Sequence, residues 1–366
     1  MRHLRTFLAT CLAAALPLGA RASDVVVPSP WAASPGPDNN SYPFGFFSPG
    51  GAGRYQQVYA ASDLLASGVA FPIAITALSF RPGQMNPTSS FPLAGETLTV
   101  TVSLAASTAA PDALSSTYAA NVSGAATVVY SGTLSLPSIP SFSGPGPYPF
   151  VWTIPLQTPY VYTGASDLLL DLSILGSSVP GANAPLDSVG ILGDAVSRQV
   201  SVGNPSAGSA DFGDTGGLIT RVSYESLFAP FGAGCAGAGG YVPSIGASGG
   251  APTLGNASFA ITLANATGGG SAFLVLGASD VSWLGVPLPI DLAPFGGPGC
   301  PLLVSGDVLI AWPVSGSGPG GGSALVPTPI PANPSLAGGT AFVQWIPSDP
   351  IAGGIRASNA AAVTLF

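Results

Sequence analysis

The segment Thr97-Leu98-Thr99-Val100-Thr101-Val102-Ser103-Leu104 decides the fold class of this chain. Polar and apolar residues alternate over all eight positions, which is the pattern of a half-buried β-strand. Further short β-type runs, separated by Gly- and Pro-rich turn clusters, follow on both sides of it. Long helical periodicity is absent, apart from a turn or two expected near residues 111–120. This spacing predicts an all-β fold of sandwich or jelly-roll type.

The predicted strands fall into two groups along the chain. The composition changes at residues 230–255, which are rich in Gly, Ala and Ser. We therefore predict two β-sandwich domains in tandem, over residues 54–229 and 230–366, preceded by a Pro/Gly/Ser-rich arm or irregular first strand at 23–53. The strands are expected at 73–81, 97–105, 127–136, 150–156, 167–175, 188–192, 198–202 and 218–224, and then at 258–263, 272–277, 289–293, 302–304, 308–313, 340–346 and 361–365.

Residues 1–22 have the features of a signal peptide. A short basic start precedes an apolar stretch at residues 7–18, and Ala20-Arg21-Ala22 forms a small-residue cleavage site. The apolar stretch is too short to cross a membrane, and we expect no membrane span in the mature chain. The sequence thus predicts a secreted or cell-surface protein whose mature form starts near Ser23.

Composition narrows the class of partner. Only 7% of residues are charged, but 47% are apolar, so the 50 Gly and 38 Pro indicate many turns in a globular protein and not disorder. All 16 acidic residues follow the leader and face only five Arg, which gives a net charge of about −11 (5 minus 16). Such a chain repels phosphate backbones and lacks a basic patch for anionic lipid, so we expect no nucleic-acid partner.

The mature chain lacks the usual catalytic bases. Its only His is His3, in the leader, and it contains no Lys. This excludes most triad hydrolases, zinc enzymes and Schiff-base enzymes, and we predict a non-enzyme. A carboxylate pair is the remaining catalytic device. The candidates are Glu96 with Glu225, and Asp167 with Asp171, which a strand would place on one face.

Two cysteines remain after the leader. Cys235 and Cys300 are expected to form a disulfide, because two cysteines in an exported chain usually pair. The bridge would close a loop of about 65 residues (300 minus 235), worth about 4 kcal/mol in the chain-entropy model.

The loop 211–217 is a candidate calcium site. Asp211 and Asp214 lie in it with Thr215 and turn-forming Gly, and Asp187 and Asp194 lie upstream. Calcium prefers clustered oxygen ligands, although the spacing is not that of an EF-hand, and Asp also favours turns by itself. Calcium is the one cofactor that the sequence suggests.

Aromatic residues offer a candidate glycan-binding face. Tyr160 and Tyr162 share a face if their segment is extended, and Trp152 precedes them. Exposed aromatic rings can stack on sugars, whereas buried ones belong to the core. Arg54 and Arg81 are expected to make internal ion pairs or stacks.

An ordered series of short stretches lies within residues 54–224. The stretches are RYQQVY (54–59), LSFRP (78–82), APDALSSTYA (110–119), VYSGTL (129–134), GPGP (144–147), TPYVY (158–162) and DLLLD (167–171). In this order the series resembles a family of exported bacterial proteins of unknown function, many of which carry a PEP-CTERM sorting tail. Residues 230–366 stand in place of that tail and are similar to C-terminal β modules on secreted proteins of environmental Gram-negative bacteria. The resemblance implies an exported, surface-related role and assigns no reaction.

We therefore expect a non-enzymatic structural or adhesive protein whose partners are cell-envelope or matrix components. The alternative is an extracellular glycan-binding module that recognises polysaccharide, with or without calcium. An acid-pair enzyme that cleaves glycans is the third hypothesis.

Overall fold

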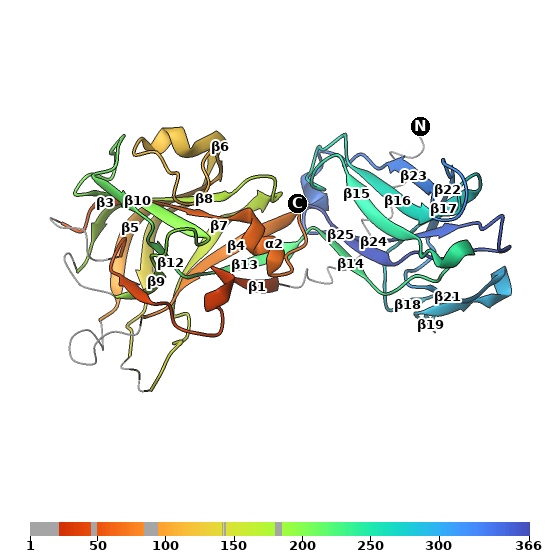
Figure 1. Ribbon diagram of the computed structural model, residues 1–366, viewed down its shortest axis with the longest axis horizontal. Coiled ribbons are helices and arrows are strands. Elements are labelled where there is room, and N and C mark those ends of the chain that lie inside the picture. Colours follow the sequence, from red (N-terminus) through yellow and green to blue (C-terminus); the bar gives the residue numbers. More distant parts are fainter. Residues whose placement is uncertain (1–21, 45–49, 84–93, 141, 143, 180–184) are drawn as a thin grey trace. The chain divides into compact units, whose positions relative to one another are not determined.

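The computed structural model describes residues 22–44, 50–83, 94–140, 142, 144–179 and 185–366 (Figure 1). The predicted leader lies outside them, apart from its last residue. The described chain forms two compact units, 22–225 and 226–366. Both consist of β-sheets, and the one α-helix in the described part is α2 (Ala61–Ala66), so the predicted all-β fold is confirmed. None of the described helices has the length and apolar character needed to cross a membrane.

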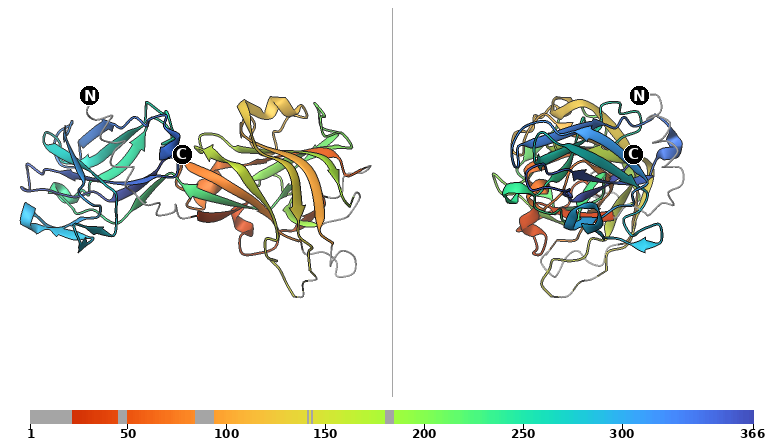
Figure 2. Two further views of the ribbon diagram at one scale, coloured as in Figure 1. Left: turned by 180° about the vertical axis from the view of Figure 1, so that it is seen from behind. Right: turned by 90° about the vertical axis from the view of Figure 1, so that its right-hand side faces the viewer.

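The described part of the N-terminal unit contains three sheets. The first has the strand order β1-β13-β4-β7, the second β11-β10-β3-β8-β5-β6 and the third β12-β9-β2. Figures 1 and 2 show the strands of this unit from three directions. Their bounds are β1 (Ala22–Val27), β13 (Thr220–Ser226), β4 (Ile73–Phe80), β7 (Trp152–Tyr162), β11 (Phe212–Asp214), β10 (Val196–Val202), β3 (Gly53–Tyr59), β8 (Leu168–Ser177), β5 (Glu96–Ser107), β6 (Val122–Leu136), β12 (Gly217–Leu218), β9 (Leu186–Val189) and β2 (Asp38–Asn40).

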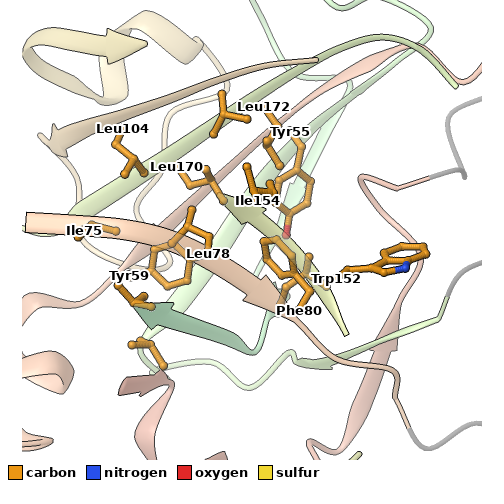
Figure 3. Packing of buried hydrophobic residues seen from close by; sticks show 14 of the residues in the cluster. Tyr55, Tyr59, Ile75, Leu78, Phe80, Leu104, Trp152, Ile154, Leu170 and Leu172 are labelled. Carbon is orange, nitrogen blue, oxygen red and sulfur yellow. The ribbon is translucent and has the colours of Figure 1, made fainter. Parts of the chain in front are cut away.

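Strand β5 shows why this sequence folds as it does. Its apolar residues Leu98, Val100, Val102 and Leu104 are buried, while the residues between them lie on the opposite face. They join one hydrophobic cluster with residues of the four-stranded sheet (Figure 3). In the close-up, side chains of β4 and β7 point toward those of β3, β5 and β8. The strict alternation thus leaves the polar face of β5 outside the core.

The segment predicted as an arm or irregular first strand contributes regular strands. In β1, Val25 and Val27 are buried, and the strand pairs with β13 from Ala22 to Val27. β2 pairs with β9. Three consecutive Val residues favour extended backbone, and the surrounding Pro and Gly residues concealed this signal.

The C-terminal unit contains a five-stranded sheet of order β14-β25-β24-β17-β22, a three-stranded sheet of order β15-β16-β23 and two ribbons, β18-β19 and β20-β21. The strands are β14 (Phe228–Phe231), β25 (Ala360–Thr364), β24 (Thr340–Pro347), β17 (Ser271–Gly277), β22 (Val308–Pro313), β15 (Ser244–Ser248), β16 (Ala260–Ala266), β23 (Gly322–Pro327), β18 (Ser282–Trp283), β19 (Val286–Pro287), β20 (Ile290–Leu292) and β21 (Gly297–Leu302). The 3-10 helices among the described residues are η1 (Ser29–Trp31), η2 (Tyr118–Asn121), η3 (Ala238–Gly240), η4 (Ala293–Phe295) and η5 (Pro334–Leu336).

The central strand β24 of the five-stranded sheet is packed on both faces. Along β24, Val343 and Trp345 join a cluster with the three-stranded sheet, whereas Phe342 and Ile346 join a second cluster with the β20-β21 ribbon. Cys235 and Cys300 form the predicted disulfide beside this second cluster, with Cα atoms 5.0 Å apart. The bridge therefore links the segment after β14 to the ribbon.

The boundary between the units lies between Glu225 and Ser226. The expected boundary at 229/230 falls inside β14, which pairs with β25 and so belongs to the C-terminal unit. The change in composition follows this strand and does not precede it.

Candidate binding site

The face of the six-stranded sheet that points away from the core carries a row of polar side chains. On β3, the side chains of Arg54 and Gln56 lie on the opposite face of the sheet from the buried Tyr55. Across the sheet Gln56 pairs with Asp171 of β8, and Asp171 with Ser103 of β5. Because residues in register share a face, these side chains are neighbours.

Arg54 and Asp171 form a two-pronged ion pair. Arg54 Nε donates to Asp171 Oδ1 at 3.0 Å, and Nη2 donates to Oδ2 at 2.7 Å. Nη1 donates to the carbonyl of Ala207, and the guanidinium lies 4.4 Å from the ring centroid of Tyr118. The hydrogen bonds to Asp171 raise the pKa of Arg54. The predicted internal pairing and stacking of Arg54 is thus confirmed.

A second layer of side chains holds this pair in place. Gln56 Nε2 donates to Asp171 Oδ2 at 3.0 Å, and Asn121 Nδ2 donates to Gln56 Oε1 at 2.7 Å. Asn121 also accepts from the backbone N–H of Ser115. Gln56, Asn121 and Tyr118 are fully buried. Such support restricts the rotamers of both partners of the ion pair, as a preorganised site requires.

A surface hollow of about 480 Å³ lies beside the ion pair. Three hydroxyl side chains line it, from Thr101, Ser103 and Ser173, and the two charges in the lining oppose each other. Small residues form the rest of the wall. The full lining is Arg54, Thr101, Ser103, Ala119, Val122, Gly124, Ala126, Asp171, Ser173 and Pro205.

The aromatic residues predicted for glycan stacking do not form an exposed platform. Trp152 and Tyr162 are 1% and 3% exposed and belong to the core. Trp152 Nε1 donates to the backbone carbonyl of Pro137, and the Tyr162 hydroxyl donates to the backbone carbonyl of Ser166. Burial raises the pKa of Tyr162. Tyr160 is half-buried, with its ring 6.5 Å from that of Tyr162. The two-residue spacing of Tyr160 and Tyr162 predicts that they share a face of the strand, but it does not predict whether that face is buried or exposed.

Asp187 of the predicted calcium group lies in a buried ion pair. Its carboxylate is 2.6 Å from Arg81 Nε, and both side chains are 1% exposed. Asp187 Oδ1 also accepts from the N–H of Gly36, and Arg81 donates to the carbonyls of Trp31 and Ser34. The predicted internal pairing of Arg81 is confirmed, and Asp187 is engaged by this cation.

The other three predicted calcium ligands also have protein partners. Asp214 pairs with Arg198 at 2.8 Å, Asp211 accepts from the N–H of Val202, and Asp194 accepts from the N–H of Val196. Within the described residues no three or more acidic, Cys or His side chains group closely enough to hold a metal ion. The four aspartates thus do not form a metal-binding group, and each is engaged by a protein donor, either a nearby backbone N–H or an Arg.

The two candidate carboxylate pairs are also separated. Glu96 lies on β5 of the six-stranded sheet and accepts from Ser177, whereas Glu225 lies on β13 of the four-stranded sheet. Asp167 accepts from the N–H of Ala61. Asp171 lies four positions further along the chain, about 13 Å at the usual rise per residue of a strand, which exceeds the roughly 5–10 Å of glycosidase pairs.

All five Arg of the described chain are paired with an Asp. The sequence did not predict which Asp pairs with which Arg, because each pair joins residues that are far apart in sequence or lie across a turn. The scarcity of charge was the available signal. The pairs are Arg54–Asp171, Arg81–Asp187, Arg198–Asp214, Arg221–Asp24 and Arg356–Asp349.

Comparison with protein-family models, curated proteins and solved structures finds no match to this chain in any of the three. Function is therefore argued from the residues and their geometry.

Proposed function

We propose that this chain is an exported, non-enzymatic protein of the cell surface or extracellular space, with two tandem β-sandwich domains and a structural or adhesive role. One observation carries the proposal: all five Arg of the described chain pair with Asp, so its cations stabilise the fold. The Cys235–Cys300 disulfide supports an oxidising, extracytoplasmic location. The partners would be cell-envelope or matrix components.

A localisation and adhesion experiment tests this proposal. An antibody against the purified chain should label intact producing cells or their culture medium, and a deletion strain should adhere or aggregate less than its parent. A cytoplasmic location, or unchanged adhesion and envelope integrity in the deletion strain, would contradict the proposal.

Enzymatic activity is the competing outcome. The purified chain should release no reducing ends from a panel of plant, algal and bacterial polysaccharides. Release that disappears in the Glu96→Gln or Glu225→Gln variant would replace the structural role by glycan cleavage.

Glycan binding is the second candidate function. The hydroxyl-lined hollow beside Arg54 and Asp171 favours it, since binding sites combine a concave surface with a few fixed polar groups. A calcium-dependent form of this candidate is tested by repeating the binding assay with EDTA.

A further inference from the structure

We propose that the hollow on the polar face of the six-stranded sheet binds a neutral, polyhydroxylated ligand, specifically a short segment of an uncharged polysaccharide. This inference rests on the glycan-binding candidate above and assigns its site. It moves that site from the aromatic residues of β7 to Arg54, Asp171 and the hydroxyls of β5 and β8.

The ion pair offers fixed donors and acceptors to such a ligand. A guanidinium has five N–H donors, and three of those of Arg54 are engaged by Asp171 and the carbonyl of Ala207. Within the described residues, one hydrogen on each terminal nitrogen has no partner. Because Gln56 is hydrogen-bonded to Asp171 and the ring of Tyr118 contacts the Arg54 guanidinium, these donors lose little rotamer freedom on binding.

The hydroxyl side chains complement a sugar, whose hydroxyls both donate and accept. Ser103 Oγ has no hydrogen-bond partner in the described part of the chain, and Thr101 Oγ1 has only a 3.4 Å contact with Ser131. Ser173 donates to the carbonyl of Pro205 and keeps its oxygen as an acceptor. Small apolar residues such as Ala126 and Pro205 line the rest and can contact the C–H faces of the ring.

Electrostatics selects neutral over acidic glycans. The charges of Arg54 and Asp171 compensate each other at 2.7 Å, so the hollow has no cation to pair with a carboxylate or sulfate. The remainder of the chain is strongly acidic and repels polyanions. Without an aromatic platform we expect millimolar dissociation constants for single oligosaccharides, which repeated units on a surface would strengthen by avidity.

The test is ligand-observed NMR titration of the purified exported chain with neutral and acidic tetrasaccharides. The probes are gluco-, manno-, xylo- and galacto-tetraose, with tetragalacturonate as the acidic probe. We expect at least one neutral probe to bind and tetragalacturonate to bind at least tenfold more weakly. Equal or tighter binding of tetragalacturonate would overturn the assignment of a neutral ligand.

Two variants and a matched control locate the binding. Thr101→Val with Ser103→Ala should raise the Kd at least fivefold, and Ala126→Leu, which narrows the hollow at an exposed position, at least tenfold. Thr99→Val removes a hydroxyl from the same face of β5 outside the hollow and should change the Kd less than twofold. Thermal unfolding of each variant checks the fold.

The titrations distinguish failure of the proposed binding site from failure of the glycan-binding function. Neutral binding that both hollow variants leave unchanged overturns this site and retains the glycan-binding candidate for another surface. The absence of binding by every neutral probe overturns both and leaves the structural role.

Discussion

The two units stabilise their non-strand segments by different chemistry. The N-terminal unit contains four of the five Arg–Asp pairs, and the C-terminal unit contains the fifth pair and the disulfide. Arg81 and Asp187 attach residues 31–36 to the sheets, while Cys235–Cys300 attaches the segment after β14 to the β20-β21 ribbon. The stability of the first unit should therefore respond to the loss of a charge, and that of the second to reduction of its disulfide.

Loss of the buried ion pair should produce the largest effect. Asp187→Asn leaves the Arg81 charge buried and unpaired, which we expect to destabilise the N-terminal unit by about 3–5 kcal/mol. Hydrogen exchange with mass spectrometry reports on each unit separately, and peptides of β3, β5 and β8 should lose protection while those of β17 and β24 keep it. The control is Asp24→Asn, whose carboxylate is 3.8 Å from Arg221 and half exposed, with an effect of about 0–1 kcal/mol. Equal effects of the two variants would show that burial does not govern these pairs.

Removal of the disulfide tests the other half of the comparison. Cys235→Ala with Cys300→Ala should destabilise the C-terminal unit by about 2–4 kcal/mol, since the bridge closes a long loop in the unfolded chain. Reductant should have the same effect on the wild-type protein and none on the double variant. If protection in the N-terminal unit falls by the same amount, the two units do not unfold independently.

The pH dependence of stability should have opposite signs at two carboxyls. Burial raises the pKa of Glu96, and its hydrogen bond from Ser177 offsets this only in part. The folded N-terminal unit therefore holds this proton more tightly than the unfolded chain. Its contribution to stability is fully present below the ordinary Glu pKa of about 4.3 and is lost as the pH rises through the folded value.

Asp349 of the C-terminal unit should behave in the opposite way. Burial acts to raise its pKa, but the N–H donors of Ala352, Ala238 and Ile351 outweigh burial and lower it. Its contribution is present above the ordinary Asp pKa of about 3.9 and is lost as the pH falls through the folded value. Unfolding of Glu96→Gln and Asp349→Asn, each compared with wild type at pH 7 and pH 4, measures this. Relative to wild type, Glu96→Gln should increase the free energy of unfolding more at pH 7 than at pH 4. Asp349→Asn should decrease it more at pH 7 than at pH 4. Changes of the same sign for the two variants would refute the assignment.

Local pattern was sufficient to predict individual strands but not their partners. The predicted strand at 308–313 coincides with β22, and alternation located β5, because side-chain period depends only on neighbouring residues. β1 was missed as a regular strand since its stability comes from pairing with β13, about 200 residues away. Asp187 was interpreted as a calcium ligand for the same reason: its partner Arg81 lies 106 residues away, and sequence spacing carries no information on such a contact.

The candidate site shows the same limit. Arg54 and Asp171 are visible as scarce charges within strands, and the internal pairing of Arg54 followed from that. The hollow itself depends on the register of β3, β8 and β5 and on the position of residues 118–126. None of these is a local property. The burial of Trp152 likewise depends on which face of β7 meets the other sheet.

The smallest effect is expected at residues whose backbone adopts the left-handed conformation, of which we compare one in each unit. Asp112 (φ 65°) is of a type that tolerates this conformation, and its carboxylate accepts from the N–H of Gly193. Leu284 (φ 49°) gains no such bond, and its side chain is 86% exposed at the turn between β18 and β19. Leu284→Asn should therefore stabilise the C-terminal unit by about 0.5–1 kcal/mol, since Asn-Gly is the preferred pair for this tight turn.

A matched control separates backbone strain from loss of an exposed Leu. Leu325→Asn replaces another exposed Leu on a regular strand, β23, where Asn is unfavourable, and should destabilise slightly. Both substitutions are best made in the Cys235→Ala, Cys300→Ala variant and followed by differential scanning calorimetry. Without the disulfide we expect the C-terminal unit to unfold first, so that small changes in its unfolding temperature can be measured. Equal shifts for the two Leu variants would assign the effect to surface hydrophobicity. A gain confined to Leu284→Asn would show that the C-terminal unit tolerates a strained turn at Leu284, whereas the N-terminal unit meets the same backbone requirement at Asp112 with a residue suited to it.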